Sequence, residues 1–387
     1  WTHFFAEQYE LQDYFTKVIH QHDLAGQVRW QTEVLAAEWD DGHGTWTVSL
    51  RSADGHTETM RARALITAVG QLNRPNIPAV DGAQTFRGPS FHSAVWDHSV
   101  ELKGKRVALV GAGASGFQIA PAIAADVKRL TVFQRTAQWM FPNPMYHDEV
   151  GDGVRWAMRH LPFYGRWYRF LVLWPGSDKG LDAAEADPNY ADQEHAVSDV
   201  NAAAHMMFSQ WITSQVGEDS ELLAKVMPDY PACGKRTLQD NGSWLRTLQR
   251  DNVELVRTPI DKITPHGIVT VDGTAYDADV IVYATGFHVT DSYTYVQIKG
   301  LHGEDLVDRW NREGIGAHRG ITVADVPNLF FLLGPNTGLG HNSVVFMIES
   351  QIRYVADAIA TCDKLGAQAL APTRAAQDRF NDELQRR

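Results

Sequence analysis

A glycine-rich turn between an apolar strand and a helix is the feature that most constrains the fold. It lies in the stretch Val107-Ala-Leu-Val-Gly111-Ala-Gly113-Ala-Ser-Gly116, which follows the pattern GxGxxG. We expect a strand over Arg106–Val110, a helix over Phe117–Val127 and a second strand over Leu130–Gln134, which make a βαβ unit of about 30 residues. Such a turn predicts a dinucleotide site, because its backbone and the helix N-terminus offer N–H groups to phosphates. The expected site residues are Gly111, Ala112, Gly113, Ala114, Ser115 and Gly116.

The end of the second strand indicates which dinucleotide this is. A site for NAD would carry Asp or Glu there to bind the ribose. This chain instead has Gln134-Arg135-Thr136. A guanidinium binds a phosphate through two hydrogen bonds, so Arg135 and Thr136 predict the 2′-phosphate of NADPH. The alternative is that Arg135 is an ordinary surface arginine that binds no phosphate.

Length and composition are those of a globular protein with two or three domains. The chain has 387 residues, of which 44% are hydrophobic and 21% are charged. The formal net charge of −12 argues against nucleic acid or an anionic membrane as the main partner. Cys233 and Cys362 are the two cysteines and lack the spacing of a redox pair or zinc site, which favours a reducing cytoplasm. No apolar run approaches the ~20 residues of a membrane span, and no histidine pattern predicts a metal.

The rest of the chain predicts an α/β protein that carries a helical insertion. Between Trp139 and Pro228 the sequence is rich in aromatic residues, Met and Ala, which favours helices over strands. Pro121 predicts a kink in the helix that follows the glycine-rich turn. The other expected elements are a helix over Ala6–His22, a hairpin of Val28–Glu38 and Thr45–Arg51, a buried strand over Ala62–Val69, a linker over Asn73–Gly82, strands Val253–Val256, Ile268–Val271, Val280–Ala284 and Leu329–Leu333, and helices Ser343–Thr361 and Thr373–Leu384.

A second motif lies directly before the βαβ unit. It reads Phe86-Arg-Gly88-Pro-Ser-Phe-His92-Ser-Ala-Val-Trp96-Asp97 and fits FxGxxxHxxxW followed by Asp or Pro. By this motif the chain resembles the Baeyer–Villiger monooxygenases, whose signature has this form. The resemblance implies that His92 belongs to the catalytic machinery by coupling domain movement rather than by carrying protons.

Two basic neighbours gain a role only through this resemblance. The stretch Tyr230-Pro-Ala-Cys-Gly-Lys235-Arg236, followed by Asp251-Asn-Val-Glu-Leu, is similar to the family's Lys-Arg segment before its RDNV strand. The resemblance implies that Lys235 joins Arg135 at the 2′-phosphate and that Arg236 is the catalytic arginine. By itself, Lys235 is as well explained as a surface charge.

Other stretches resemble the parts of the family that face the flavin. Ala284-Thr285-Gly286-Phe287 is similar to the ATGF link to the FAD domain, and Thr67-Ala-Val-Gly70 is similar to its partner. Gly334-Pro-Asn336-Thr-Gly338 and His341-Asn342-Ser343 resemble the turn and helix start beside the flavin. The implied FAD-binding residues are Thr285, Gly286, Asn336 and Asn342.

The resemblance covers the chain from about Phe4 to Phe380 and is similar in detail to the 4-hydroxyacetophenone monooxygenase branch. It implies two Rossmann-like dinucleotide-binding domains, the FAD one incomplete. The expected division is residues 1–97 for the first part of the FAD domain and the linker, 98–140 for the first part of the NADPH domain, 141–228 for the helical insertion, 229–283 for the second part of the NADPH domain and 284–387 for the second part of the FAD domain. The family's first GxGxxG and its C-terminal tail are absent from this sequence, so we expect a truncated chain that binds FAD poorly alone.

The activity implied by the resemblance is a Baeyer–Villiger oxidation. With NADPH, FAD and O2, one oxygen atom would be inserted next to a ketone carbonyl to give an ester or lactone, the cofactors carrying the redox chemistry. Two alternatives stay open: a flavin monooxygenase that oxygenates N or S atoms, and a catalytically incomplete NADPH-binding fragment. The usual fingerprint of the former lacks the ending seen at Trp96-Asp97.

Overall fold

The structure is a computed structural model that describes residues 1–387 except 175, 176, 178, 179, 218, 219, 290–293, 339, 341, 342 and 387. Its internal contacts divide the chain into two units. Unit 1 comprises Trp1–Tyr14, Pro75–Gly286 and Gly340–Asn342, and unit 2 comprises Phe15–Arg74, Phe287–Leu339 and Ser343–Arg387. The glycine-rich turn lies in unit 1. The assignment of the expected domains to FAD and NADPH stays a prediction.

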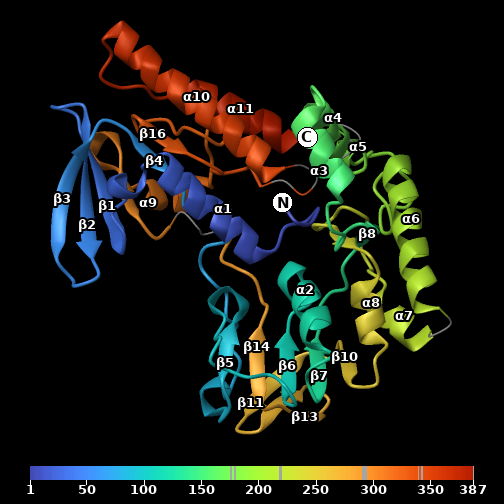
Figure 1. Ribbon diagram of the computed structural model, residues 1–387. Helices are drawn as coiled ribbons and strands as arrows, with labels where there is room; N and C mark the ends of the chain where they lie inside the picture. The colour runs from blue at the N-terminus through green and yellow to red at the C-terminus, as the bar shows by residue number, and fades with distance from the viewer. Residues whose placement is uncertain are drawn as a thin grey trace. The chain divides into compact units, whose positions relative to one another are not determined.

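A parallel sheet of five strands forms the centre of unit 1 (Figure 1). Its order is β10-β7-β6-β14-β5. The strands are β5 (Ser90–His92), β6 (Arg106–Val110), β7 (Arg129–Phe133), β10 (Val253–Val256) and β14 (Val280–Tyr283). Counted from β6, the chain adds β7 and β10 on one side and then returns to place β14 on the other. This order is that of a doubly wound dinucleotide-binding sheet.

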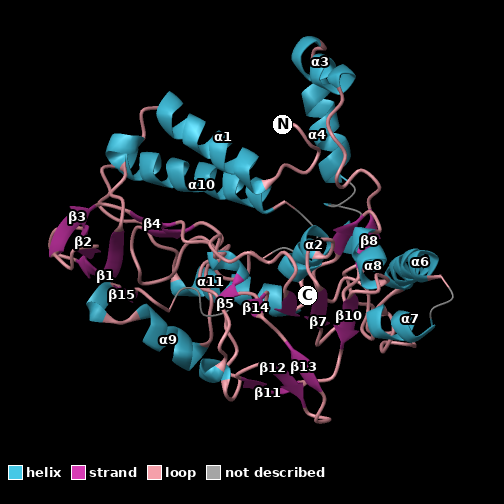
Figure 2. Ribbon diagram, turned by 60° about the horizontal axis from the view of Figure 1, so that its bottom comes forward, coloured by secondary structure: helices cyan, strands magenta, loops and turns pink. Residues whose placement is uncertain are grey.

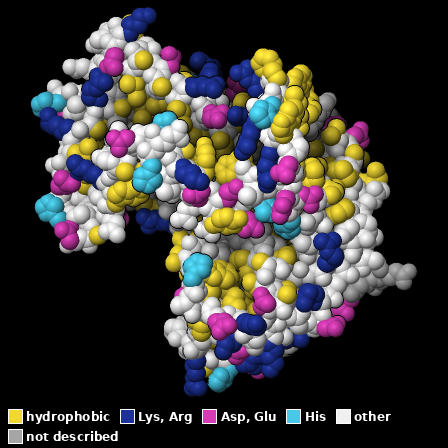
Figure 3. All heavy atoms as spheres, viewed as in Figure 1, with side chains coloured by type: hydrophobic (Ala, Val, Ile, Leu, Met, Phe, Trp, Pro, Cys, Tyr) yellow, Lys and Arg dark blue, Asp and Glu magenta, His cyan; other side chains and the backbone are white. Residues whose placement is uncertain are grey.

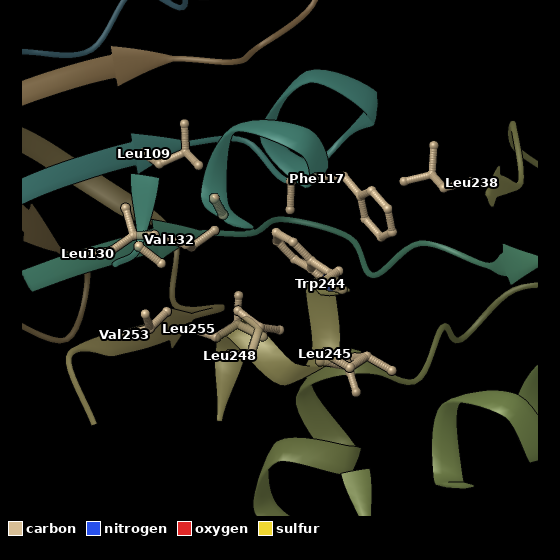
Figure 4. Packing of buried hydrophobic residues seen from close by; sticks show 14 of the residues in the cluster. Leu109, Phe117, Leu130, Val132, Leu238, Trp244, Leu245, Leu248, Val253 and Leu255 are labelled. Atoms are coloured by element: carbon tan, nitrogen blue, oxygen red, sulfur yellow. The ribbon is translucent and has the colours of Figure 1, made fainter. Parts of the chain in front are cut away.

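The central strands are buried on both faces, which explains their continuous apolar sequences. Alternate residues of β6 point to opposite faces, so Leu109 packs into one core cluster and Ala108 into another. On the first face lie α2 (Ala114–Ile123) and α8 (Ser243–Leu248). There the ring of Phe117 stacks on that of Trp244 at a centroid distance of 5.2 Å (Figure 4). The other face packs against residues of a small antiparallel sheet of β11 (Ile260–Thr264), β12 (Gly267–Thr270) and β13 (Ala275–Asp277).

The expected insertion between Trp139 and Pro228 is mainly helical (Figure 2). It contains β8 (Met140–Pro142), α3 (Asp152–His160), α4 (Tyr164–Trp174), α5 (Gly180–Asp182), α6 (Asp199–Val216) and α7 (Ser220–Val226), and β8 pairs with β9 (Leu238–Asp240). The hydroxyl of Ser198 caps α6, whose Phe208, Ile212 and Val216 recur at helical spacing on the buried side.

Helix α4 differs from α6, because none of its side chains is buried. Trp167 is 63% exposed and Phe170 is 45% exposed. In Figure 3, hydrophobic side chains gather at the position that α4 has in Figure 1, next to basic ones. Among the described residues, no helix has both the length and the apolar character needed to cross a bilayer.

Unit 2 contains a four-stranded sheet and a separate parallel pair of strands. The sheet has the order β15-β1-β2-β3, with strands β1 (Thr32–Asp40), β2 (Thr45–Ser52), β3 (Thr57–Ala62) and β15 (Gln297–Lys299); β4 (Leu65–Thr67) pairs with β16 (Leu329–Phe331). Trp39 and Trp46 face each other across the β1–β2 hairpin, with ring centroids 5.5 Å apart. The helices are α9 (Leu306–Glu313), α10 (Val344–Leu365) and α11 (Arg374–Arg386). The residues of α1 (Gln8–Gln21) are divided between the units. Short 3-10 helices lie at Ala83–Thr85 and Ser93–Val95 in unit 1, and at Ala25–Gln27 and Leu301–Gly303 in unit 2.

Most expected elements are confirmed, and two needed correction. Helix α2 begins at Ala114 rather than at Phe117, and it ends at Ile123, two residues after Pro121. The strand expected over Ala62–Val69 is shorter than predicted, because β3 ends at Ala62 and the separate strand β4 covers only Leu65–Thr67. Its predicted burial is wrong, since Ile66 is 45% exposed. Among the described strands, β4 pairs only with β16, so its apolar residues are not enclosed as they would be in the middle of a sheet.

Candidate functional site

One row of paired residues crosses the parallel sheet of unit 1 at the carboxyl ends of its strands. In order it contains His92, Tyr283, Val110, Phe133 and Val256. The segments that leave the strands after this row therefore emerge at one edge of the sheet. They carry the glycine-rich turn after β6, Arg135 and Thr136 after β7, and Thr285 and Gly286 after β14. Doubly wound sheets bind their ligands at this edge, where the strand order reverses.

The three glycines of the turn have different surroundings. A Cβ on Gly111, whose φ is 106°, would lie 2.4 Å from the carbonyl oxygen of Ala284. A Cβ on Gly116 would lie 2.0 Å from the carbonyl oxygen of Gly111. A Cβ on Gly113 would meet no atom of the described chain within 4 Å. The outer glycines are thus required by packing, whereas the middle one borders open space, as is expected of a backbone that a pyrophosphate approaches closely.

Arg135 and Gln134 are adjacent but face different surroundings. Gln134 is 4% exposed, and its Nε2 donates a hydrogen bond of 3.0 Å to the carbonyl of Lys225. Arg135 is exposed. The carboxamide is therefore used inside the protein, while the guanidinium is available to a ligand at the edge of the sheet.

Lys235 and Arg236 are exposed neighbours on the loop that leads into β9. The Nζ of Lys235 lies 4.8 Å from the centre of the Tyr230 ring. The hydroxyl of Tyr230 donates to the carbonyl of Ala137 at 3.1 Å, directly after Arg135-Thr136 in the chain. Tyr230 thus links the loop that carries Lys235 to the segment that carries Arg135.

The charge of Arg236 acts on Tyr146. Burial raises the pKa of the Tyr146 phenol, and the Arg236 cation opposes this shift. Arg236 therefore stands close enough to influence ionisation of a group in the helical insertion. Burial also raises the pKa of the Cys233 thiol in the same loop, which keeps it protonated.

His92 is inside unit 1 and only 3% exposed. Its Nδ1 accepts a hydrogen bond of 3.1 Å from the backbone N–H of Ala94. Burial lowers the pKa of the imidazole, and a backbone hydrogen bond with Gly286 partly offsets this effect. Gly286 is the last residue of its stretch in unit 1, so His92 contacts the point at which the chain leaves the unit.

The expected FAD residues lie in two places. Thr285 and Gly286 belong to unit 1, whereas Asn336 belongs to unit 2, where it is exposed with φ at 61° in the turn between β16 and α10. The hydroxyl of Ser343 caps α10 at the end of this turn. Asn342 lies outside the described residues. No group of acidic, histidine or cysteine side chains that would suit a metal occurs in the part of the chain that the structure describes.

Two buried polar residues of unit 1 were not singled out as site residues from the sequence. Asn201 and Asp240 are both 0% exposed. Asn201 donates a hydrogen bond to Ala232, at the start of the segment that carries Lys235 and Arg236. Asp240 is the other end of this segment and accepts a hydrogen bond from Trp211. Asn201 reads as an ordinary residue in the first turn of a helix, and nothing near it in the sequence indicates its partner. Nothing in the sequence near Asp240 indicates that its carboxyl group is buried.

Comparison with known proteins finds related flavin-dependent monooxygenases. Residues 2–154 match the family model described as flavin-binding monooxygenase-like. A Baeyer–Villiger monooxygenase of Pseudomonas aeruginosa is 36% identical over all of this chain and 70% of its own length. An uncharacterized monooxygenase of Sinorhizobium fredii is 36% identical over 98% of this chain, which spans only 57% of that protein. The crystal structure of a cyclohexanone monooxygenase from Rhodococcus bound to NADP+ matches 99% of this chain and 75% of that chain, with 30% identity and a TM-score of 0.83.

Proposed function

The chain belongs to the Baeyer–Villiger monooxygenase family, and on this premise we propose that it takes part in oxidising a ketone to an ester or lactone with NADPH, FAD and O2. Small-molecule substrates are the common partners of such monooxygenases. A cytoplasmic location, which the two free cysteines favour, belongs to the proposal as well.

The observation that carries the proposal is the shared edge of the parallel sheet. Gly111 and Gly116 are packed against backbone, Gly113 borders open space, and Arg135 is exposed on the neighbouring strand end. A pyrophosphate at the turn would place the adenosine ribose toward the end of β7, where a cation suits a 2′-phosphate. This combination supports NADPH over NADH.

The remaining residues divide between the two cofactors. Residues 111–116, Arg135, Thr136 and Lys235 are proposed to bind NADPH, and Thr285, Gly286, Asn336 and Asn342 to bind FAD. FAD, when bound, supplies the redox chemistry by which O2 is activated. The exposed turn at Asn336 and the capped start of α10 suit a flavin edge.

Arg236 is proposed as the catalytic residue. A guanidinium stays protonated at every working pH, so it provides a fixed positive charge. Such a charge stabilises negative charge that develops on a reacting oxygen, which is often the largest single contribution to catalysis. His92 is proposed to act differently. Its buried imidazole contacts the link at Gly286, where the chain leaves unit 1, so its proposed role is to couple movement of this link to the site rather than to carry protons.

Product analysis tests the proposal directly. The purified chain is incubated with FAD, NADPH, 18O2 and a set of cyclic and aryl ketones, and products are identified by mass spectrometry. One 18O atom in an ester or lactone supports it. Sulfoxide from a thioether without any ester from ketones would favour the N- or S-oxygenating alternative. Binding of NADP+ with no oxygenated product would favour a nucleotide-binding fragment.

A further inference from the structure

The loop that carries Lys235 and Arg236 is held at both ends by one helix of the insertion. We use the name Lys-Arg loop for residues 232–240, of which the last three form β9 and pair with β8. Its middle is exposed, whereas Ala232 is 2% exposed and Asp240 is 0% exposed. Both buried ends make hydrogen bonds to side chains of α6.

The first attachment is through Asn201, which is 0% exposed in the first turn of α6. Its Nδ2 donates to the carbonyl of Ala232 at 2.7 Å and to the carbonyl of Ala183 at 2.7 Å. Its Oδ1 accepts from the backbone N–H of Val197 at 3.2 Å. Both amide hydrogens are used, so rotation of this side chain would leave a buried carbonyl without a donor.

The second attachment is through Trp211, ten residues further along α6. Its Nε1 donates to Oδ2 of Asp240 at 3.1 Å. The backbone carbonyl of Asp240 also accepts from the N–H of Asn143 at 2.7 Å, which ties the same loop end to the segment after β8. Burial raises the pKa of the Asp240 carboxyl, and the hydrogen bond from Trp211 opposes this shift. The indole N–H therefore stabilises a carboxylate that the protein interior disfavours.

The spacing of these attachments leaves slack in the loop. Ten residues of an α-helix span roughly 15 Å along its axis, whereas the eight steps from Ala232 to Asp240 could extend about 26 Å. The chain between Ala232 and Asp240 is therefore longer than the helical span between Asn201 and Trp211, and its exposed middle, residues 234–236, forms an arch. The arch begins at Cys233, which has a φ of 64°, and at Gly234, whose N–H donates to the carbonyl of Pro231 at 3.1 Å. Lys235 and Arg236 follow directly, on the exposed part of the arch.

We propose that Asn201 and the Trp211–Asp240 pair are positioning residues that set where Lys235 meets the 2′-phosphate of NADPH. The inference rests on the proposed function and adds to it: recognition of the phosphate depends on α6, which carries none of the proposed nucleotide-binding residues. If either attachment is released, Lys235 gains freedom that it must lose again on binding. Binding of NAD+, which has no 2′-phosphate, does not need Lys235 and should not change.

Isothermal titration of the purified chain with NADP+ and with NAD+ tests this inference. Trp211→Phe removes the N–H and keeps an aromatic ring; we expect the Kd for NADP+ to rise about ten-fold and that for NAD+ to stay within about two-fold. Trp167→Phe makes the same change at a 63% exposed position and should alter neither Kd. In the Lys235→Ala background, Trp211→Phe should add nothing further, because the two changes remove the same interaction.

The possible results are distinguishable. Equal weakening of NADP+ and NAD+ by Trp211→Phe would mean that Trp211 only stabilises the fold, and the inference would be wrong. Unchanged NADP+ binding in Trp211→Phe, although Lys235→Ala weakens it, would also overturn the inference and leave the proposed function standing. A wild-type chain that binds neither nucleotide would overturn both. If Trp211→Phe lacks a cooperative thermal transition, Asn201→Asp, which keeps the shape and removes both donors, is measured by the same ratio of Kd values.

Discussion

The hydroxyl of Thr285 donates a hydrogen bond of 2.5 Å to the backbone carbonyl of Asn76, 209 positions earlier in the chain. The N–H of Asn76 donates in turn to the carbonyl of Gly286 at 2.9 Å. These bonds join the two segments that lead out of unit 1, one ending at Gly286 and the other beginning at Pro75. The segments therefore leave the unit as a bonded pair rather than as two independent strands of chain.

Thr285→Val should loosen this pair without changing the shape of the side chain. Loss of one hydrogen bond lowers the free energy of unfolding by about 1 kcal/mol, which corresponds to a melting temperature lower by about 2–4 °C. Calorimetry measures the shift, and amide exchange at Asn76 should accelerate. Thr59→Val, at an exposed position of β3, serves as the control. Unchanged exchange at Asn76 would count against the joined pair.

Gly116→Ala should lower the stability of the protein, whereas Gly113→Ala should weaken the binding of NADP+. The Cβ at position 116 would collide with a carbonyl at 2.0 Å, so unfolding should become easier by about 1–3 kcal/mol. The Cβ at position 113 meets no described atom within 4 Å, and the φ of −73° there suits alanine, so stability should change by less than about 1 kcal/mol. Its methyl group nevertheless occupies the space proposed for the pyrophosphate. NADP+ binding should weaken about ten-fold in Gly113→Ala, as measured by titration. Normal NADP+ binding by the folded variant would contradict the placement of the pyrophosphate next to Gly113.

Arg135→Asp should reverse the preference between nucleotides. A carboxylate at the end of β7 would repel a 2′-phosphate and could accept hydrogen bonds from a free ribose hydroxyl. We expect NADP+ affinity to fall by about 100-fold, and the affinity for NAD+ to hold or rise. Lys128→Asp, an exposed position at the amino end of the same strand, makes the same change in net charge. If both variants weaken NADP+ equally, the effect comes from total charge rather than from the site.

Arg236→Ala and Lys235→Ala should separate chemistry from binding. Arg236→Ala should leave the Kd for NADP+ within about two-fold of wild type but lower ester formation by at least about 100-fold, because the fixed charge near the reacting oxygen is lost. Lys235→Ala should instead raise the Kd for NADP+ by about ten-fold. The measurements are titration and ester yield under saturating NADPH. Normal ester yield from Arg236→Ala would remove it from its proposed role.

His92 should make stability depend on pH on the acidic side of neutrality. Burial lowers its pKa from the ordinary 6.5, so the unfolded chain binds a proton at higher pH than the folded chain does. Stability contributed by the neutral imidazole is therefore present above pH 6.5 and is lost as pH falls from there through the lowered pKa.

His92→Asn removes this titration and keeps an acceptor for the Ala94 N–H. Its melting temperature should fall less than that of wild type between about pH 7.5 and about pH 5.5. His98→Asn, at an exposed position, provides the comparison. Equal falls in wild type and His92→Asn would show that folding does not lower the pKa of His92.

The parts of the fold that were predictable from sequence are those with a local signal. The strand Arg106–Val110 and the turn after it have such a signal, because a continuous apolar run and fixed glycine spacing both lie within about ten residues. Helix α2 begins three residues before the predicted Phe117. Its start has no local signal, because Ala114, Ser115 and Gly116 have no apolar periodicity and Gly113 has no side chain with which to cap the helix. Propensity gives no boundary where the capping group is the backbone itself.

The parts that were not predictable depend on partners far away in the chain. The apolar run around Ile66 is typical of a buried strand, but burial requires neighbouring strands on both sides. Among the described strands, β4 has β16 as its one partner, and no local pattern in the sequence indicates this pairing. Asn201 and Ala232 are likewise 31 residues apart, and an asparagine in a first helical turn is common without such a bond. Expected site residues were identified by motif, whereas the residues that hold them in place carry no motif.

The row from His92 to Val256 has a consequence for insertions and deletions. The segments that carry the proposed site residues begin within two residues of this row, so one residue removed from β6, β7 or β14 would draw a wall of the proposed site back by about 3.3 Å and turn its side chains to the other face. We therefore expect insertions and deletions in these three strands to abolish nucleotide binding. They should be tolerated where the chain travels far before it returns to the sheet, as in the helical insertion. Variation in length can thus reshape what lies around the nucleotide without moving the nucleotide itself.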